Sequence, residues 1–295
     1  MKKSLNLLSL KNIMEKRILL TECTDDVGLI AKITNVCSLF HLNVTRQDQF
    51  ASPEDHKFFM RTVIEGDFSN EKTVKTFIDT VISLLPQGAN VRLADEHRRR
   101  LCVLVTKESH CLGELLMKTY SGALNADIVC VAGNHPDLGA LAEKFNVPFK
   151  LVSCDGITKE EQEKRMIEVI DSTNCDYVIL AKYMRILSPE FVGHYPLGKI
   201  INIHHSFLPA FIGAKPYHQA YNRGVKLIGA TAHFVTNNLD EGPIIEQDVI
   251  KVNHRYDPET LAKAGHDVEQ MVLIRAISKV LDDKVFIHGN KTVVF

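Results

Sequence analysis

Hydrophobic and polar positions divide the first third of the chain into six short elements. Apolar residues recur at every third or fourth position in 24–40 and again in 70–85, which is the spacing of a helix with one buried face. β-rich runs flank these two stretches and include a pair of strands joined by the polar turn 52–55. The expected elements are strand 17–23, helix 24–40, strand 43–52, strand 56–66, helix 70–85 and strand 89–94. This order predicts a ferredoxin-like βαββαβ domain, with Asp25 or Asp26 capping the first helix.

From residue 101 onward, strands and helices alternate along the chain. The apolar runs are nearly continuous, which indicates strands that are covered on both faces. A long helix over 257–283 comes before a terminal hairpin at Gly289-Asn290. The expected strands are 101–106, 126–133, 148–154, 176–181, 199–203 and two more within 226–250. We therefore predict an α/β domain with a doubly wound, mostly parallel sheet, in which ligands bind at the carboxyl ends of the strands.

A charged run, Asp95-Glu96-His97-Arg98-Arg99-Arg100, separates the two patterns. It contains almost nothing to bury, so we interpret 95–100 as a solvated linker between a domain over 17–94 and a second domain over 101–295. Residues 1–16 break their apolar stretch with Ser, Lys and Asn and carry no small-residue cleavage site, which favours a frayed extension. An organelle transit peptide is the alternative, because the segment has some amphipathic character.

Composition narrows the choice of partner and compartment. The chain of 295 residues is 45% hydrophobic and 24% charged with a formal net charge of -1, so no overall field favours nucleic acid or an anionic membrane. No apolar run approaches the roughly 20 residues that a membrane-spanning helix needs. The 7 cysteines are scattered and form no C-x-x-C pair, which is typical of a reducing compartment. We expect a cytoplasmic protein that binds a small molecule.

A dense group of polar residues begins within the apolar run KIINI, 199–203. Asn202 and His204 are separated by one residue, so on a strand both side chains point to the same side. His233 lies in a later predicted strand, and Asp240 lies in the polar turn 237–243. An amide, an imidazole and a carboxylate suit acyl chemistry at a carbonyl. The amide donates to the oxygen that becomes negative, the imidazole supplies a second donor or a proton, and the acid orients or activates the attacking group.

The residues alone leave other assignments open. A histidine beside a strand end is commonly a structural residue. A metal site formed by His204, His205, His233 and Asp240 is disfavoured, because adjacent histidines on a strand point to opposite sides and no H-x-x-x-H pair is present. Ser206 lacks the G-x-S-x-G turn that exposes a nucleophilic serine.

Motif similarity narrows these alternatives. The run N-I-H-H-S-F-L-P at 202–209, followed by H-F-V at 233–235 and L-D-E-G-P at 239–243, resembles the folate-dependent formyltransferase family. The resemblance implies that Asn202, His204 and Asp240 form the catalytic trio. The segment 181–192, AKYMRILSPEFV, is similar to the family's folate-binding segment. The resemblance implies no metal and no cofactor beyond the folate substrate. The pocket residues that it implies are Met184, Arg185, Ile186, Leu187, His233 and Val235.

The amino-terminal block resembles an ACT domain through the D-x-x-G turn at 25–28, which leads into the first predicted helix. This resemblance implies a homo-oligomer and an amino-acid effector, with glycine and methionine as candidates. A dimerisation module without a ligand is the alternative. An ACT domain followed by a formyltransferase-like domain is the arrangement of the formyltetrahydrofolate deformylase family, which the chain resembles over nearly its whole length after residue 16.

The loop after the first strand of the second domain bears on the formyl acceptor. Transferases of the family that act on glycinamide ribonucleotide have a glycine-rich loop there, whereas this chain has Thr106-Lys107-Glu108-Ser109-His110, in which Glu108 repels an anion. The stretches 106–112 and 253–269 also resemble the deformylases. Residues 214–218 are expected to close over the space that an amine acceptor would occupy.

These similarities imply a hydrolase that converts 10-formyltetrahydrofolate and water to formate and tetrahydrofolate. Such a reaction would supply formate for purine synthesis and balance the one-carbon pool. Formyl transfer to an amine is the rival enzymatic function. An amino-acid-binding regulator with an inactive enzyme domain is the rival without catalysis.

Overall fold

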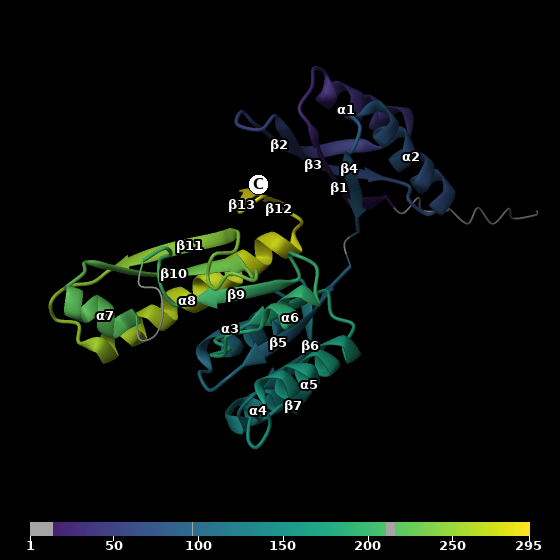
Figure 1. The fold of residues 1–295 in the computed structure, drawn as a ribbon. Helices are drawn as coiled ribbons and strands as arrows, with labels where there is room; N and C mark the ends of the chain where they lie inside the picture. The colour runs from purple at the N-terminus through teal and green to yellow at the C-terminus, as the bar shows by residue number, and fades with distance from the viewer. Residues whose placement is uncertain (1–13, 96, 211–215) are drawn as a thin grey trace, which may run out of the picture. The chain divides into compact units, whose positions relative to one another are not determined.

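The computed structural model describes residues 14–95, 97–210 and 216–295, so most of the predicted extension 1–16 lies outside the described residues. Glu15 and Lys16 already belong to the first strand. The chain forms two compact units that divide between His97 and Arg98 (Figure 1). None of the helices in the described ranges is both long enough and apolar enough to span a bilayer.

The first unit is a four-stranded antiparallel sheet with two helices, in the order β2-β3-β1-β4. This order confirms the ferredoxin-like prediction. Phe59 and Phe77 are among its largest fully buried side chains, and Phe77 of the second helix packs edge-on against Phe40. The elements are β1 (Glu15–Thr24), α1 (Leu29–Leu39), β2 (Asn43–Ser52), β3 (Lys57–Gly66), α2 (Glu71–Leu84) and β4 (Asn90–Ala94).

The start of α1 differs from the prediction that Asp25 or Asp26 would cap it. Gly28 occupies the N-cap position in a left-handed conformation, with φ of 81°, and no side chain caps the helix. A glycine adopts this conformation readily because it has no Cβ. Asp26 instead accepts a hydrogen bond from the Val27 N–H at 2.7 Å and lies 3.4 Å from Lys32 Nζ.

The second unit contains a seven-stranded sheet in the order β11-β10-β9-β8-β5-β6-β7. The neighbouring strands β9, β8, β5, β6 and β7 are parallel to one another. Strand β10 runs antiparallel to both β9 and β11. This confirms the mostly parallel α/β prediction. The elements are β5 (Arg99–Val105), α3 (His110–Tyr120), β6 (Ala126–Gly133), η1 (Pro136–Leu138), α4 (Gly139–Lys144), β7 (Phe149–Leu151), α5 (Lys159–Ser172), β8 (Tyr177–Leu180), α6 (Pro189–Gly193), β9 (Ile200–His204), α7 (Pro216–Arg223), β10 (Leu227–Phe234), β11 (Ile244–Lys251), α8 (Pro258–Leu281), β12 (Val285–His288) and β13 (Lys291–Val294).

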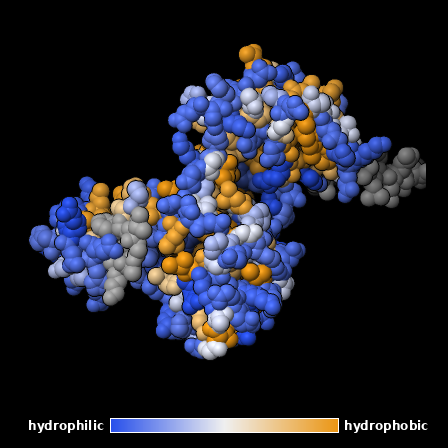
Figure 2. Space-filling view, viewed as in Figure 1, coloured by the Kyte–Doolittle hydropathy of each residue, from blue (hydrophilic) through white to orange (hydrophobic). Residues whose placement is uncertain are grey.

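Helices cover both faces of this sheet, as the nearly continuous apolar strands require. Along β5, Leu101, Val103 and Val105 belong to the core that packs against α3 and α8. The alternate residues Cys102 and Leu104 belong to the core beneath α5 and α6. The surface visible in Figure 2 is mostly hydrophilic with separate hydrophobic patches, as is normal for a folded chain.

The predicted linker 95–100 overlaps the second unit, because strand β5 already includes Arg99 and Arg100, while Arg98 and Arg100 stay exposed to solvent as the charge pattern indicated. Strand β5 begins at Arg99, and the Arg99 guanidinium donates to Asp283 Oδ2 at 3.2 Å. Arg98 donates to Asp127 Oδ1 at 2.9 Å, and Arg100 donates to two carbonyl groups at the end of α5. Arginine side chains can make such contacts while their charged ends stay near water. The three arginines therefore anchor the start of the second unit.

Candidate active site

The strand order of the second sheet reverses between β5 and β8. The chain moves from β5 outward to β6 and β7, then returns to β8 on the opposite side and continues to β9. Such a switch point leaves a crevice at the carboxyl ends of the strands. A pocket of about 440 Å³ lies at these strand ends. It is lined by residues 182–187, 202–205 and 235–240, together with Leu180, Val192 and His233.

The structure brings together the residues expected to form the catalytic trio. Asn202 and His204 lie at the end of β9, and the antiparallel pairing of β10 sets His233 opposite Asn202. Asp240 follows in the turn after β10, where its Oδ1 lies 3.3 Å from His204 Nδ1 and 3.8 Å from His233 Nε2. The amide nitrogen of Asn202 lies 3.2 Å from His233 Nε2. Four polar side chains from two strands and a turn thus converge on one pocket.

His233 orients the Asn202 amide. The Phe234 carbonyl lies 2.9 Å from His233 Nδ1, so this nitrogen carries the proton and donates it to the carbonyl. Burial lowers the pKa of His233, which favours the neutral ring. Nε2 then accepts one N–H of Asn202, and the second N–H of the amide stays available to the pocket. The pairing of β10 with β11 is irregular between Ala232 and His233, and irregularities of this kind re-aim side chains beside active sites.

Two backbone features hold Asp240 beside the strand ends. Asp240 itself has φ of 57°, a left-handed conformation that aspartate tolerates better than most residues. At Gly242 a Cβ atom would lie 1.8 Å from the Phe234 carbonyl oxygen, so only glycine allows the turn to approach β10 this closely. The L-D-E-G-P run therefore encodes the position of the acid as well as its identity.

The charge state of Asp240 follows from its surroundings. Burial would raise the pKa of this carboxyl group, but the hydrogen bond from His204 and the nearby imidazoles hold the pKa below its ordinary value. The carboxylate form therefore dominates at neutral pH. His204 donates through Nδ1 to this carboxylate, and its buried Nε2 has no hydrogen-bond partner within the part of the chain that the structure describes. A substrate oxygen would satisfy that nitrogen when the ring is protonated.

The residues expected to contact folate line the same pocket. Met184, Arg185, Ile186, Leu187 and Val235 all belong to its wall, as does His233. The Met184 N–H donates to Thr106 Oγ1 at 2.9 Å, which ties this segment to the end of β5. Met184 and Ile186 are 55% and 62% exposed. Apolar side chains that stay exposed in a pocket offer area that a flat aromatic ligand can cover.

Sequence reasoning missed a charged cluster behind one wall of the pocket. Lys182 lines the pocket, is only 4% exposed, and follows an apolar strand with no motif around it. Its ammonium lies 3.1 Å from a carboxylate oxygen of Glu269, which is fully buried in α8. A lysine and a glutamate in otherwise apolar segments were the available signal, because charged residues are almost never fully buried unless they are paired.

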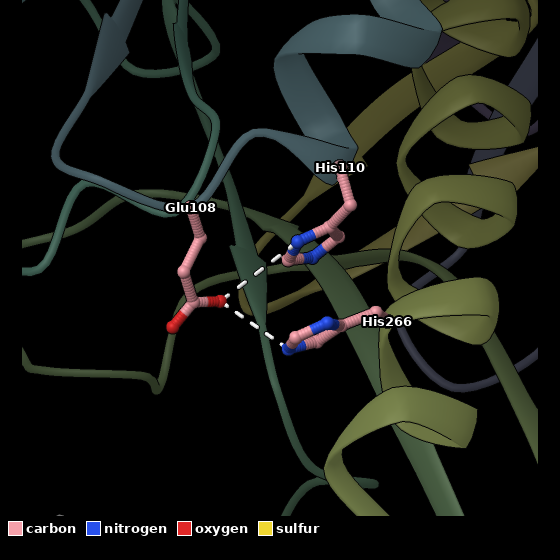
Figure 3. A group of neighbouring side chains, drawn as sticks. All are labelled: Glu108, His110 and His266. Atoms are coloured by element: carbon pink, nitrogen blue, oxygen red, sulfur yellow. Dashed lines mark ion pairs between the residues drawn. The ribbon is translucent and has the colours of Figure 1, made fainter. Parts of the chain in front are cut away.

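His110, His266 and Glu108 extend this cluster (Figure 3). The two imidazole rings stack with centroids 4.0 Å apart and planes within 9°, and Glu108 Oε2 lies 3.8 Å from His110 Nδ1 and 3.4 Å from His266 Nε2. A metal ion needs nitrogen lone pairs that converge on one point. The lone pairs of two stacked rings lie in parallel planes, so this arrangement favours polar contacts with Glu108 over metal binding. His266 is a packing residue of this cluster.

The comparisons with known proteins agree with this architecture. The family described as formyl transferase matches residues 99–277. Formyltetrahydrofolate deformylase of Haemophilus influenzae is 55% identical over 96% of this chain and 100% of its own length. The Escherichia coli K12 protein of the same name is 53% identical over 95% of this chain and 99% of its own length.

A solved structure extends the agreement to three dimensions. The crystal structure of a formyltetrahydrofolate deformylase from Pseudomonas syringae pv. tomato matches with a TM-score of 0.90 at 39% identity, over 98% of this chain and 96% of that one. The match spans both units of the fold. The chain therefore belongs to the formyltetrahydrofolate deformylase family.

Proposed function

We propose that the chain hydrolyses 10-formyltetrahydrofolate to formate and tetrahydrofolate at the pocket that contains Asn202, His204 and Asp240. The observation that carries the proposal is the convergence of these three side chains, in a protein of this family, on a pocket with an apolar wall. Formate produced in this way supplies purine synthesis and balances the one-carbon pool. No metal and no cofactor beyond the folate substrate takes part in the proposed reaction.

The acid and the two donors have complementary roles in this mechanism. The Asp240 carboxylate orients a water molecule and accepts its proton as the oxygen attacks the formyl carbon. The carbonyl oxygen becomes negative and accepts hydrogen bonds from the free Asn202 N–H and from His204 Nε2–H. The bond between the formyl carbon and N10 then breaks, and N10 takes up a proton. Formate and tetrahydrofolate are the products.

The expected lowering of the reaction barrier by these groups is large enough for effective catalysis. A donor that stabilises an oxyanion typically contributes about 3 kcal/mol to lowering the barrier, and general acid–base help adds roughly 10²- to 10⁴-fold. The low exposure of His204 and His233, at 6% and 2%, strengthens these interactions because little water competes for them.

The folate is proposed to lie on the wall formed by Met184, Arg185, Ile186, Leu187 and Val235. Main-chain groups of residues 184–187 would contact the pterin ring, and the turn that ends at Asp240 would cover its other side. This placement leaves the formyl group beside Asn202 and His204.

Formate release by the purified protein tests the proposal. The assay supplies 10-formyltetrahydrofolate without nucleotide or added metal and measures formate and tetrahydrofolate, which should appear in equal amounts. Parallel reactions with primary amines test the rival transfer reaction. A formylated amine that replaces formate as the main product would refute the hydrolytic assignment, and folate binding without turnover would favour a non-catalytic regulator.

The first unit is proposed to act as an amino-acid sensor within a homo-oligomer. A pocket of about 390 Å³ beside the D-x-x-G turn is lined by Asp25, Asp26, Gly28 and Gln49, among others. Its carboxylates can pair with an ammonium group, and backbone at Gly28 can approach a ligand closely. Val27 and Phe50 are 90% and 43% exposed, so a second copy that covered this edge would bury apolar area.

Binding and mass measurements on the whole protein test this role. Glycine and methionine are titrated calorimetrically, and formate release is followed with each. Asp26→Asn should weaken binding of the effective amino acid. Sedimentation should show a mass above that of one chain, whereas a single-chain mass at micromolar concentration would refute the oligomer.

The compartment is proposed to be the cytoplasm. All seven cysteines are free, and all but Cys154 are buried, so the fold does not depend on a disulfide. This usage fits a reducing environment.

A further inference from the structure

Glu269 lies at the centre of a buried network behind the pocket wall. Its Oε2 lies 2.7 Å from His110 Nε2 and 3.1 Å from Lys182 Nζ, and its Oε1 accepts a hydrogen bond from the Tyr217 hydroxyl at 2.5 Å. Three segments far apart in the chain therefore direct donors at one carboxylate from α8. We call Glu269, His110, Lys182 and Tyr217 the Glu269 cluster.

The cluster leaves little capacity to bind another cation or amine. A carboxylate offers about four acceptor positions, and three of those on Glu269 are taken. Burial would raise the pKa of Glu269, but hydrogen bonds from His110 and Tyr217 and the charge of Lys182 lower it to about 2. The group is therefore a carboxylate with most of its acceptor positions occupied within the fold.

Tyr217 is held in place from two sides. Its hydroxyl reaches Glu269, and its ring lies over Gly265, where a Cβ atom would be only 2.0 Å from the hydroxyl oxygen. Glycine inside a helix costs about 1 kcal/mol relative to alanine. The position of Tyr217 explains why α8 nevertheless has a glycine there. Tyr217 is 9% exposed, although residues 211–215, which precede its helix, lie outside the described residues.

The held tyrosine is separated from His204 by the His205 ring. The His205 ring lies 5.1 Å from the His204 ring and 6.3 Å from the Tyr217 ring, measured between centroids. His205 and Lys182 line the pocket, and Tyr217 and Glu269 support them from behind. Lys182 has a left-handed backbone with φ of 61°, which costs a non-glycine residue about 1 to 2 kcal/mol. Strain retained at a pocket wall is typical of a functional position.

We infer that Tyr217, held between Glu269 and Gly265, fixes from behind the pocket wall that Lys182 and His205 form, and that this wall excludes an acceptor larger than water from the formyl carbon. Tyr217 and Gly265 then determine acceptor specificity. The inference rests on the proposed function, because it concerns which nucleophile attacks at that site. Water and a primary amine compete for the same carbon.

The two reactions differ in one bond. With water, a carbon–oxygen bond forms, the carbon–N10 bond breaks, one proton passes from the water to N10, and formate leaves as the second proton is released. With a primary amine, a carbon–nitrogen bond forms, the carbon–N10 bond breaks, a proton passes from the amine to N10, and an N-formyl amine leaves. No oxidant or reductant is needed in either case. The ratio of formylated amine to formate therefore reports acceptor choice directly.

Two variants perturb the tyrosine from opposite sides. Tyr217→Ala removes the ring, and Gly265→Ala displaces it by inserting a methyl group into its place. With glycinamide as the amine probe, each should raise the ratio of N-formylglycinamide to formate roughly tenfold or more, because about one methylene in a pocket shifts discrimination by about 10- to 200-fold. Tyr217→Phe keeps the ring but loses the hydrogen bond to Glu269, so its ratio should rise less.

Matched controls separate this effect from general damage. Tyr221→Ala removes a tyrosine from the same helix that is 48% exposed, and Gly113→Ala adds a Cβ in α3 that meets no atom within 4 Å. Both should keep the product ratio of the unmodified protein. Far-ultraviolet circular dichroism and urea unfolding confirm that each variant is folded.

Each outcome bears on one proposal. Unchanged ratios in folded Tyr217→Ala and Gly265→Ala proteins that still release formate would overturn the inference, as would efficient formylation of glycinamide by the unmodified protein. If Tyr217→Ala does not fold, Gly265→Ala and Tyr217→Phe decide. Absence of formate release from the unmodified protein would instead refute the proposed function itself.

Discussion

Replacing Asp240 by asparagine isolates the contribution of its negative charge. The side chain lies 3.3 Å from His204 Nδ1 and 3.8 Å from His233 Nε2. Its backbone φ of 57° is tolerated by asparagine, whereas most other residues would add about 1 to 2 kcal/mol of strain. Asp240→Asn therefore keeps the turn and the shape of the side chain while removing the group that accepts a proton from water.

The expected loss follows from that role. General base help is worth roughly 10²- to 10⁴-fold, or about 3 to 5 kcal/mol of barrier, so kcat for formate release should fall by this factor. KM should change little, because the segment 184–187 that is proposed to bind folate lies elsewhere on the pocket wall. The carboxylate also accepts the hydrogen bond that positions His204, so the loss should lie toward the upper end of the range.

Single-turnover formate release gives the decisive measurement, because it excludes product release from the observed rate. Asp267→Asn is the matched control, since Asp267 is an exposed residue of α8, and it should retain the activity of the unmodified protein. Urea unfolding at pH 7 checks that both variants are folded. Retention of more than about a tenth of kcat by folded Asp240→Asn would refute the assignment of Asp240 as the base.

Substitutions at three further positions test the surroundings of the trio. His233→Phe removes the nitrogen that orients Asn202, so kcat for formate release should fall about tenfold or more with KM nearly unchanged. His233→Gln restores a hydrogen-bond acceptor and should recover part of the lost kcat in the same assay. Glu269→Leu leaves the Lys182 ammonium buried without its main partner, so urea unfolding should show a loss of about 3 to 5 kcal/mol, with a smaller loss for Glu269→Gln. Burial holds the pKa of His205 at about 4, so between pH 6.5 and 4 the unfolded chain binds a proton that the folded chain does not. Stability should therefore decline as pH falls through this window, and His205→Gln should remove part of the decline, at most about 3 kcal/mol, whereas an identical pH profile would contradict the argument.

The elements were predictable where one local pattern decides them. Asn70 caps α2 through hydrogen bonds from the backbone N–H groups of Lys72 and Thr73, and Gly289 turns the terminal hairpin with φ of 57°. Both features depend on residues a few positions apart. The start of α1 was mispredicted because two adjacent aspartates suggested a side-chain cap, whereas the turn depends on Gly28. The contacts of the arginine run were not predicted, because its partners, including Asp127 and Asp283, lie far along the chain.

The identities of the site residues were predictable from the sequence, but their orientation was not. The spacing of Asn202 and His204 places both on one side of a strand, and motif similarity supplied Asp240 and the pocket residues. What no local pattern indicated was the orientation of the Asn202 amide by His233, since this depends on which residues the pairing of β9 and β10 sets opposite each other. These assignments to catalysis stay predictions until the variants are assayed.

The amino-acid sequence by itself determined the secondary structure, the order of the two units, the family, and the chemical groups available for reaction, because these depend on residue types and short spacings. The tertiary structure alone decided which groups meet. His110 and Glu269 are 159 positions apart, yet they share a hydrogen bond because α3 and α8 pack on the same face of the sheet. A contact of this kind follows from strand order and helix packing, which no local spacing contains, and the network that supports the pocket wall depends on it.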